Sequence, residues 1–202
     1  MRTSKKIFFV AFFLSNFQLL HAQRFHAGMI GGISTTQVAG DQLSGFNKAG
    51  VIVGGFVNSP ISDKTSLQME IIFIQKGSRK PVQTDNDNQF YVMRLSYFEV
   101  PVLFKWQVAT KLNVEAGPSF GTLIFSEEER EWGVYQPNPP FKAFEFSGNI
   151  GLSYPLTEKL KVNSRFSSSI LPIRPFVQNY DLSFFNKGQY NTVLTFTLQY
   201  QF

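Results

Sequence analysis

Cysteine is absent from the 202-residue chain, which excludes disulfide bonds and metal sites built on thiolates. Charged residues are scarce as well, at 16% of the chain against roughly 25% in a typical soluble domain. Aromatic residues reach the same 16%, and 23 of them are Phe. We therefore expect stability to come from burial and backbone pairing, with a phase other than water covering part of the surface.

The chain also lacks a strong excess of one charge. Its formal net charge is +5, but Arg2, Lys5 and Lys6 lie in a leader without acids. The remainder has 16 of the 19 basic residues against 14 acidic residues, a net charge of about +2. This near balance, without a long basic run, argues against a nucleic-acid partner.

Residues 1–22 have the three parts of a secretory signal peptide. The three basic residues are followed by an apolar run from Ile7 to Leu14, a weaker continuation and Leu20-His21-Ala22 before Gln23. The apolar run is shorter than the ~20 residues of a spanning helix, and no later run is long enough. The sequence predicts a cleaved signal at 1–22 and one domain at 23–202, with any membrane crossing made by strands.

Eight segments rich in β-branched and aromatic residues follow the leader, without helical periodicity. They cover residues 25–35, 48–58, 65–76, 94–107, 111–124, 143–154, 160–171 and 190–202. Their lengths suit the ~9–11 residues of a tilted transmembrane strand. The links between them alternate between short turns and long polar loops, so all long loops fall at one end. The predicted fold is all-β: a single eight-stranded antiparallel up-and-down transmembrane β-barrel.

One face of each segment is bulky and apolar, and the other is polar. The last segment places Leu194, Phe196 and Leu198 on one face and Thr195 and Thr197 on the other. Charges fall mid-strand on the polar faces, which suits a narrow lumen where they neutralise each other. The predicted lumen ion-pair network is Glu70, Glu99, Lys105, Glu115, Glu145 and Arg165.

The ends of the chain and of its strands suggest further contacts. A terminal aromatic preceded by apolar residues at every second position resembles the signal read by the barrel assembly machinery: Phe196, Leu198, Tyr200 and Phe202. Basic residues near the long loops are candidates for pairing with lipopolysaccharide phosphates, although ordinary rim charge explains them equally well: Arg79, Lys80, Arg94, Lys142, Arg174 and Lys187.

The fourth segment carries the one distinctive motif, Tyr97-Phe98-Glu99-Val100-Pro101-Val102-Leu103-Phe104-Lys105-Trp106. It resembles the Y-x-E-[IV]-P-x-L-x-K-[YW] strand of the PorT-like small outer-membrane β-barrel proteins of Bacteroidota. Gln75-Lys76-Gly77 and Ala116-Gly117-Pro118-Ser119-Phe120-Gly121 add to the resemblance. The resemblance implies an outer-membrane barrel, and some members of the family are linked to secretion and gliding.

No pattern indicates catalysis, a cofactor or a metal. Gly117-Pro118-Ser119-Phe120-Gly121 matches the nucleophile-elbow spacing, but it lies inside a strand pattern and no histidine follows His26. Asp85-Asn86-Asp87-Asn88 lacks the glycine and glutamate of a calcium loop. The acidic run Glu127, Glu128, Glu129 and Glu131 suits a solvated loop tip, with weak divalent-cation bridging as the alternative.

The sequence thus predicts a non-enzymatic barrel in the bacterial outer membrane, with both termini periplasmic and the long loops extracellular. Its expected partners are outer-membrane lipid, lipopolysaccharide, the assembly machinery and an envelope or secretion-system protein. A structural or interaction role is favoured, with an accessory role in secretion as one form of it. A small-ligand or ion pore and a secreted soluble lipocalin-like carrier remain as alternatives.

Overall fold

A computed structural model describes residues 25–41, 43, 45–80, 90–175 and 188–202. The predicted signal peptide at 1–22 lies outside these residues, as do Asp85, Asp87 and Lys187. Among the described residues, no helix has the length and hydropathy to cross a membrane.

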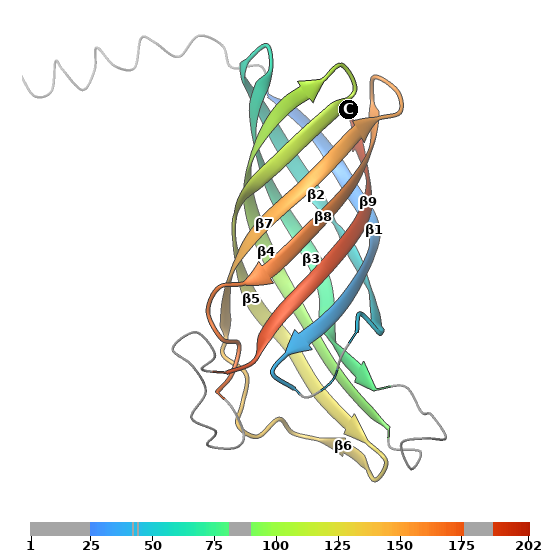
Figure 1. Cartoon of the computed structure of the whole chain (residues 1–202), viewed down its shortest axis with the longest axis vertical. Helices are drawn as coiled ribbons and strands as arrows, with labels where there is room; N and C mark the ends of the chain where they lie inside the picture. Colours follow the sequence, from blue (N-terminus) through green and yellow to red (C-terminus); the bar gives the residue numbers. More distant parts are fainter. Residues whose placement is uncertain (1–24, 42, 44, 81–89, 176–187) are drawn as a thin grey trace, which may run out of the picture.

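The chain forms nine antiparallel strands, eight of which close into a barrel (Figure 1). The strands are β1 (His26–Ala39), β2 (Lys48–Ser62), β3 (Thr65–Lys80), β4 (Tyr91–Ala109), β5 (Leu112–Arg130), β6 (Gly133–Tyr135), β7 (Phe144–Pro155), β8 (Leu160–Ser169) and β9 (Tyr190–Gln201). Each ring strand pairs with its neighbour in the chain, β5 pairs with β7, and β9 pairs with β1. The predicted eight-stranded up-and-down barrel is confirmed.

Side chains alternate across the barrel wall with the apolar side outward. On β9, Phe196 and Leu198 are about half exposed, whereas Thr195 and Thr197 are buried. On β4, Phe98 and Phe104 face outward, while Glu99 and Lys105 face inward. Water-soluble barrels have the opposite arrangement, so the outer surface is suited to lipid.

The short turns all lie at one end of the barrel (Figure 1). The turn end has residues 63–64, 110–111 and 156–159 between strands, together with both ends of the described ring. There the backbone N–H of Phe202 donates to the carbonyl of Ala27 at 3.0 Å. The strand ends that the four long links join lie at the other end, called the loop end below.

Four strands run further towards the loop end than their sequence pattern predicts. β1 ends at Ala39 rather than residue 35, and β3 ends at Lys80 rather than residue 76. β4 begins at Tyr91 rather than residue 94, and β5 continues to Arg130 rather than residue 124. The residues beyond the ring still pair with each other, from Arg94↔Glu127 to Tyr91↔Arg130. The predicted loop 125–142 is therefore partly strand, and β6 folds back on β5 as a hairpin that projects past the ring (Figure 1).

Candidate functional site

The half of the lumen nearer the turn end is crossed by a group of ion pairs called here the Arg165 cluster: Glu70, Lys105, Glu115 and Arg165. The guanidinium of Arg165 donates to both carboxylate oxygens of Glu70 at 2.7 and 2.8 Å and to Glu115 Oε1 at 2.7 Å. The amine of Lys105 lies 3.1 Å from Glu115 Oε2. Strands β3, β4, β5 and β8 are thus tied together across the interior.

A second group, the Lys76 cluster, lies nearer the loop end and consists of Lys76, Glu99 and Glu145. The amine of Lys76 is 2.7 Å from Glu145 Oε1 and also pairs with Glu99. Glu145 accepts further hydrogen bonds from Ser147 Oγ at 2.7 Å and Asn191 Nδ2 at 2.6 Å. This cluster connects β3, β4, β7 and β9, and its three charged side chains are buried.

All six predicted lumen charges lie inside the barrel, divided between the two clusters. The sequence prediction missed Lys76, the central cation of the second cluster. A signal for it was present, because Lys76 follows Glu70 at an even spacing along β3 and therefore shares its face. The next residue, Gly77, has φ +133°, and an added Cβ would lie 2.0 Å from the carbonyl oxygen of Met93. Only glycine fits there beside the lysine.

The motif that resembles the PorT-like family supplies lumen residues. Glu99 pairs with Lys76, Lys105 pairs with Glu115, and the buried ring of Tyr97 lies 5.1 Å from the Lys76 amine. The alternating Phe98, Val100, Phe104 and Trp106 are exposed on the outside of the barrel. This strand is distinctive because it lines the interior with specific partners and the outside with bulky apolar groups.

An apolar layer of buried side chains packs inside the barrel, beside and beyond the Lys76 cluster. Its members come from β1, β2, β3, β4 and β9 and from the link that follows β8: Ile30, Val38, Ile52, Phe56, Ile72, Ile74, Met93, Leu95, Tyr97, Ile173 and Val193. That link is held inward by backbone hydrogen bonds of 2.8 Å from Ile173 to Gln189 and 2.7 Å from Lys142 to Ile173. Part of this layer, including Met93 and Ile173, lies between the Lys76 cluster and the loop end.

Arg174 is not a rim residue, contrary to the sequence prediction. It is 3% exposed, because the inward link carries it to Glu128, and the two charges meet at 2.6 Å. Its Nε donates to Gln189 at 2.6 Å, and its guanidinium lies 4.3 Å from the centre of the Phe141 ring. Tyr91 also donates to Glu128 at 2.9 Å, so Arg174 belongs to a buried polar group above the apolar layer.

The other predicted rim cations differ in their surroundings. Arg79 and Lys142 are exposed, Lys80 is half buried, and Lys187 lies outside the described residues. Arg94 is about 40% exposed but pairs with Glu127 and Glu129, each at 2.6 Å. Three residues of the acidic run are therefore not at a solvated loop tip: Glu127 to Glu129 lie on β5, and each has a basic partner. Glu131 alone is exposed in the turn that follows β5.

The remaining sequence candidates lie apart. Gly117 to Gly121 form the middle of β5 with Ser119 buried, so the strand, turn and helix of a nucleophile elbow are not present there. His26 lies at the turn end on β1, far along the barrel from the loop end. Phe196, Leu198 and Tyr200 face outward on β9, and their role as an assembly signal stays a prediction.

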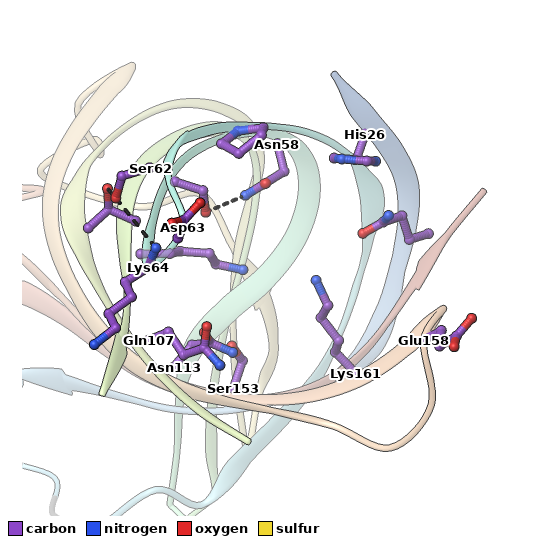
Figure 2. Close-up of a pocket in the computed structure, with 15 residues that line it drawn as sticks. His26, Asn58, Ser62, Asp63, Lys64, Gln107, Asn113, Ser153, Glu158 and Lys161 are labelled. Atoms are coloured by element: carbon purple, nitrogen blue, oxygen red, sulfur yellow. Dashed lines mark hydrogen bonds between the residues drawn. The ribbon is translucent and has the colours of Figure 1, made fainter. Parts of the chain in front are cut away.

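A polar pocket of about 360 Å³ opens at the turn end (Figure 2). Its walls include Asn58, Asn113, Ser153 and Gln201, with Lys105 and Lys161 as inward-facing cations. Lys105 belongs to the Arg165 cluster, so the pocket reaches down to that cluster. The predicted lumen network did not include Lys161, which is the second residue of β8.

One titrating group at the loop end is perturbed by its surroundings. Asp41 follows β1, and burial raises the pKa of its carboxyl group above the ordinary value. Its Oδ1 accepts from the backbone N–H of Leu43 at 2.9 Å, whereas the buried Oδ2 has no hydrogen-bond partner. The folded state therefore favours the protonated acid.

A closed antiparallel ring with a lipid-compatible outside and a polar, ion-paired inside defines the class of transmembrane β-barrels. Residues 15–174 match the model of the outer membrane protein beta-barrel domain family. The chain belongs to this family, which is an outer-membrane family.

Solved structures agree on the fold. Ail of Yersinia pestis, solved with the heparin analogue sucrose octasulfate, is 9% identical, with a TM-score of 0.51 over 89% of this chain and 99% of Ail. Neisserial surface protein A is 9% identical, with a TM-score of 0.52 over 88% of this chain and 97% of its own. A comparison with curated proteins found no match.

Proposed function

We propose that this protein is a non-enzymatic outer-membrane barrel that acts through its two ends and does not conduct through its lumen. The filled interior is the observation that carries this proposal. Two ion-pair clusters and an apolar layer occupy the interior between the turn-end pocket and the loop end. An eight-stranded barrel is just wide enough to be filled by side chains in this way.

The paired charges favour a lumen closed by its own side chains over a path for ions. Arg165, Glu115 and Lys76 are each 5% exposed or less, and each makes short contacts with groups of opposite charge. A conducting lumen would need these groups to exchange their partners for water, which the apolar layer with Met93 and Tyr97 disfavours. The pore alternative is therefore less well supported than a structural or interaction role.

We propose the usual orientation, with the turn end periplasmic and the loop end extracellular. The short turns and the alternation of link lengths support it, because outer-membrane barrels generally have short periplasmic turns and longer external loops. The exposed cations Arg79 and Lys142 then lie where lipopolysaccharide phosphates could pair with them.

The loop end is the proposed interaction surface for an external partner. The β5–β6 hairpin extends beyond the ring and presents Trp132, 86% exposed, beside exposed Val134 and Tyr135. Exposed aromatic side chains of this kind are enriched at the centres of protein interfaces. An accessory role in secretion is the second candidate, and only the resemblance of the 97–106 strand favours it.

Bilayer conductance tests the proposal directly. Refolded full-length protein in a planar bilayer is expected to pass almost no current. Steady single-channel currents would show an open lumen and would overturn the proposal that the lumen does not conduct. The matched charge variant Lys142→Gln, outside the lumen, should behave like the wild type.

The hairpin role has its own experiment. Trp132→Ala should abolish crosslinks from the hairpin to its surface partner in intact cells, whereas Glu131→Ala at the same tip should keep them. Equal crosslinking by both variants would place the partner elsewhere. The accessory role in secretion would be refuted if a strain that lacks this protein exported its proteins at the normal rate.

A further inference from the structure

The buried charges of the lumen do not balance. In the part of the chain that the structure describes, the buried acids are one more than the buried bases: Glu70, Glu99, Glu115, Glu128 and Glu145 against Lys76, Lys105, Arg165 and Arg174. A buried charge without a partner is costly, so the extra negative charge needs compensation.

The extra negative charge belongs to the Lys76 cluster. The Arg165 cluster pairs two cations with two carboxylates, and Arg174 is matched by Glu128. Half-buried Lys161 lies at the turn-end pocket, whose walls also include the acids Asp63 and Glu158. In the Lys76 cluster, by contrast, two carboxylates share one ammonium group.

The walls around this cluster supply no second unmatched cation among the described residues. The groups that surround Glu99 and Glu145, strand by strand, are Lys76 on β3, Tyr97 on β4, Gly121 on β5, Ser147 on β7, Arg165 on β8 and Asn191 on β9. Arg165 is held by Glu70 and Glu115, and the buried side chains of β1 and β2 carry no charge. Lys48, at the loop end of β2, donates to the carbonyl of Ala49 at 2.8 Å instead.

Hydrogen bonding distinguishes the two carboxylates. Glu145 has three donors, the Lys76 amine at 2.7 Å, Ser147 Oγ at 2.7 Å and Asn191 Nδ2 at 2.6 Å. Within the described residues, Glu99 has only the Lys76 amine. Donors stabilise the charged form of an acid, so the negative charge is better placed on Glu145 and a proton on Glu99.

We propose that the Lys76 cluster is a proton-binding site, in which the folded barrel holds one proton on Glu99 at neutral pH while Lys76 and Glu145 remain an ion pair. Two carboxylates bound to the same amine repel each other, which favours the protonation of one of them. With this proton, the buried negative and positive charges become equal in number. An alkali cation would supply the same charge but would need space for its ligands, and the buried Tyr97 and Ile74 pack beside the cluster.

Infrared spectroscopy of the refolded full-length protein in a maltoside detergent tests this site. The carbonyl stretch of a protonated carboxyl group is separate from the bands of a carboxylate, and exposed acids are ionised at pH 8. The wild type should show the protonated band, Glu99→Gln should lose it, and Glu131→Gln, which changes an exposed acid, should keep it. Absence of the band from the wild type, or its persistence in Glu99→Gln, would overturn the proposal.

A second variant covers the case in which Glu99→Gln does not fold, as judged by the heat-dependent shift on a gel. Glu145→Gln leaves one carboxylate for one amine, so Glu99 should ionise and the protonated band should disappear. Retention of the band by folded Glu145→Gln would contradict the sharing of one ammonium as its cause.

The pH dependence of stability gives an independent measurement. A glutamate of the unfolded chain ionises near about pH 4.3, so above about pH 5 the folded protein holds one proton more than the unfolded chain and loses stability as pH rises. Between pH 6 and pH 8 the folding constant of the wild type, relative to Glu99→Gln, should fall about tenfold for each pH unit. The wild type and Glu131→Gln should change in parallel. A constant ratio between the wild type and Glu99→Gln over this range would refute the bound proton.

Replacing sodium by choline at constant ionic strength separates a proton from an alkali cation. The urea midpoint of the wild type should stay the same, because a proton is supplied by water in both solutions. A loss of stability in choline that Glu99→Gln does not share would assign the compensating charge to a metal ion and overturn the proton site.

Discussion

Replacing Arg165 by methionine should be the most damaging single change in the lumen. The guanidinium makes three hydrogen bonds of 2.7–2.8 Å to Glu70 and Glu115. Methionine fills much of the same volume but leaves Glu70 without a cationic partner at 1% exposure. Breaking a buried pair from one side generally costs about 3–5 kcal/mol, and we expect Arg165→Met to lower the free energy of unfolding by that amount.

Urea unfolding in detergent, followed by tryptophan fluorescence and by the heat-dependent gel shift, measures this loss. Arg79→Met is the matched control, because Arg79 is exposed and should tolerate the same replacement. The double variant Arg165→Met with Glu70→Gln should recover part of the loss, since it removes the unpaired charge. If Arg165→Met and Arg79→Met were equally stable, the lumen would be hydrated and the reasoning refuted.

Three further predictions concern the wall, the packing and the loop end. Phe196→Arg, near the middle of the outward face of β9, should cost about 2–4 kcal/mol in lipid, and a neutral result would place that face in water. Gly77→Ala should destabilise by about 1–3 kcal/mol because of its positive φ and the Met93 carbonyl, whereas Gly31→Ala, with open space around it, should be tolerated. Asp41→Asn should raise the urea midpoint at pH 7 and lose this gain below about pH 4. The raised pKa of Asp41 means that its carboxylate destabilises the fold above that pKa, and protonation removes the penalty as pH falls. A gain that persisted at pH 3 would rule out ionisation as the cause.

Sequence alone determined the wall of this barrel. Period-two alternation decides which side chains share a face, and a strand cannot turn Glu99 inward without also turning Phe98 and Val100 outward. The spacing of turn and loop residues likewise determined the number of ring strands and their order. These features depend on neighbours in the chain, which is why reading the sequence recovered them.

The tertiary structure decided which charged side chains pair across the lumen. Arg165 meets Glu70 from 95 positions away, and Lys76 meets Glu145 from 69 positions away. Such pairings depend on strand register and on the closure of β9 against β1, which no local pattern encodes. The burial of Arg174 required the link after β8 to fold inward. The shape of the closed ring decides which of these distant residues pair, because only closure brings opposite walls within the reach of a side chain.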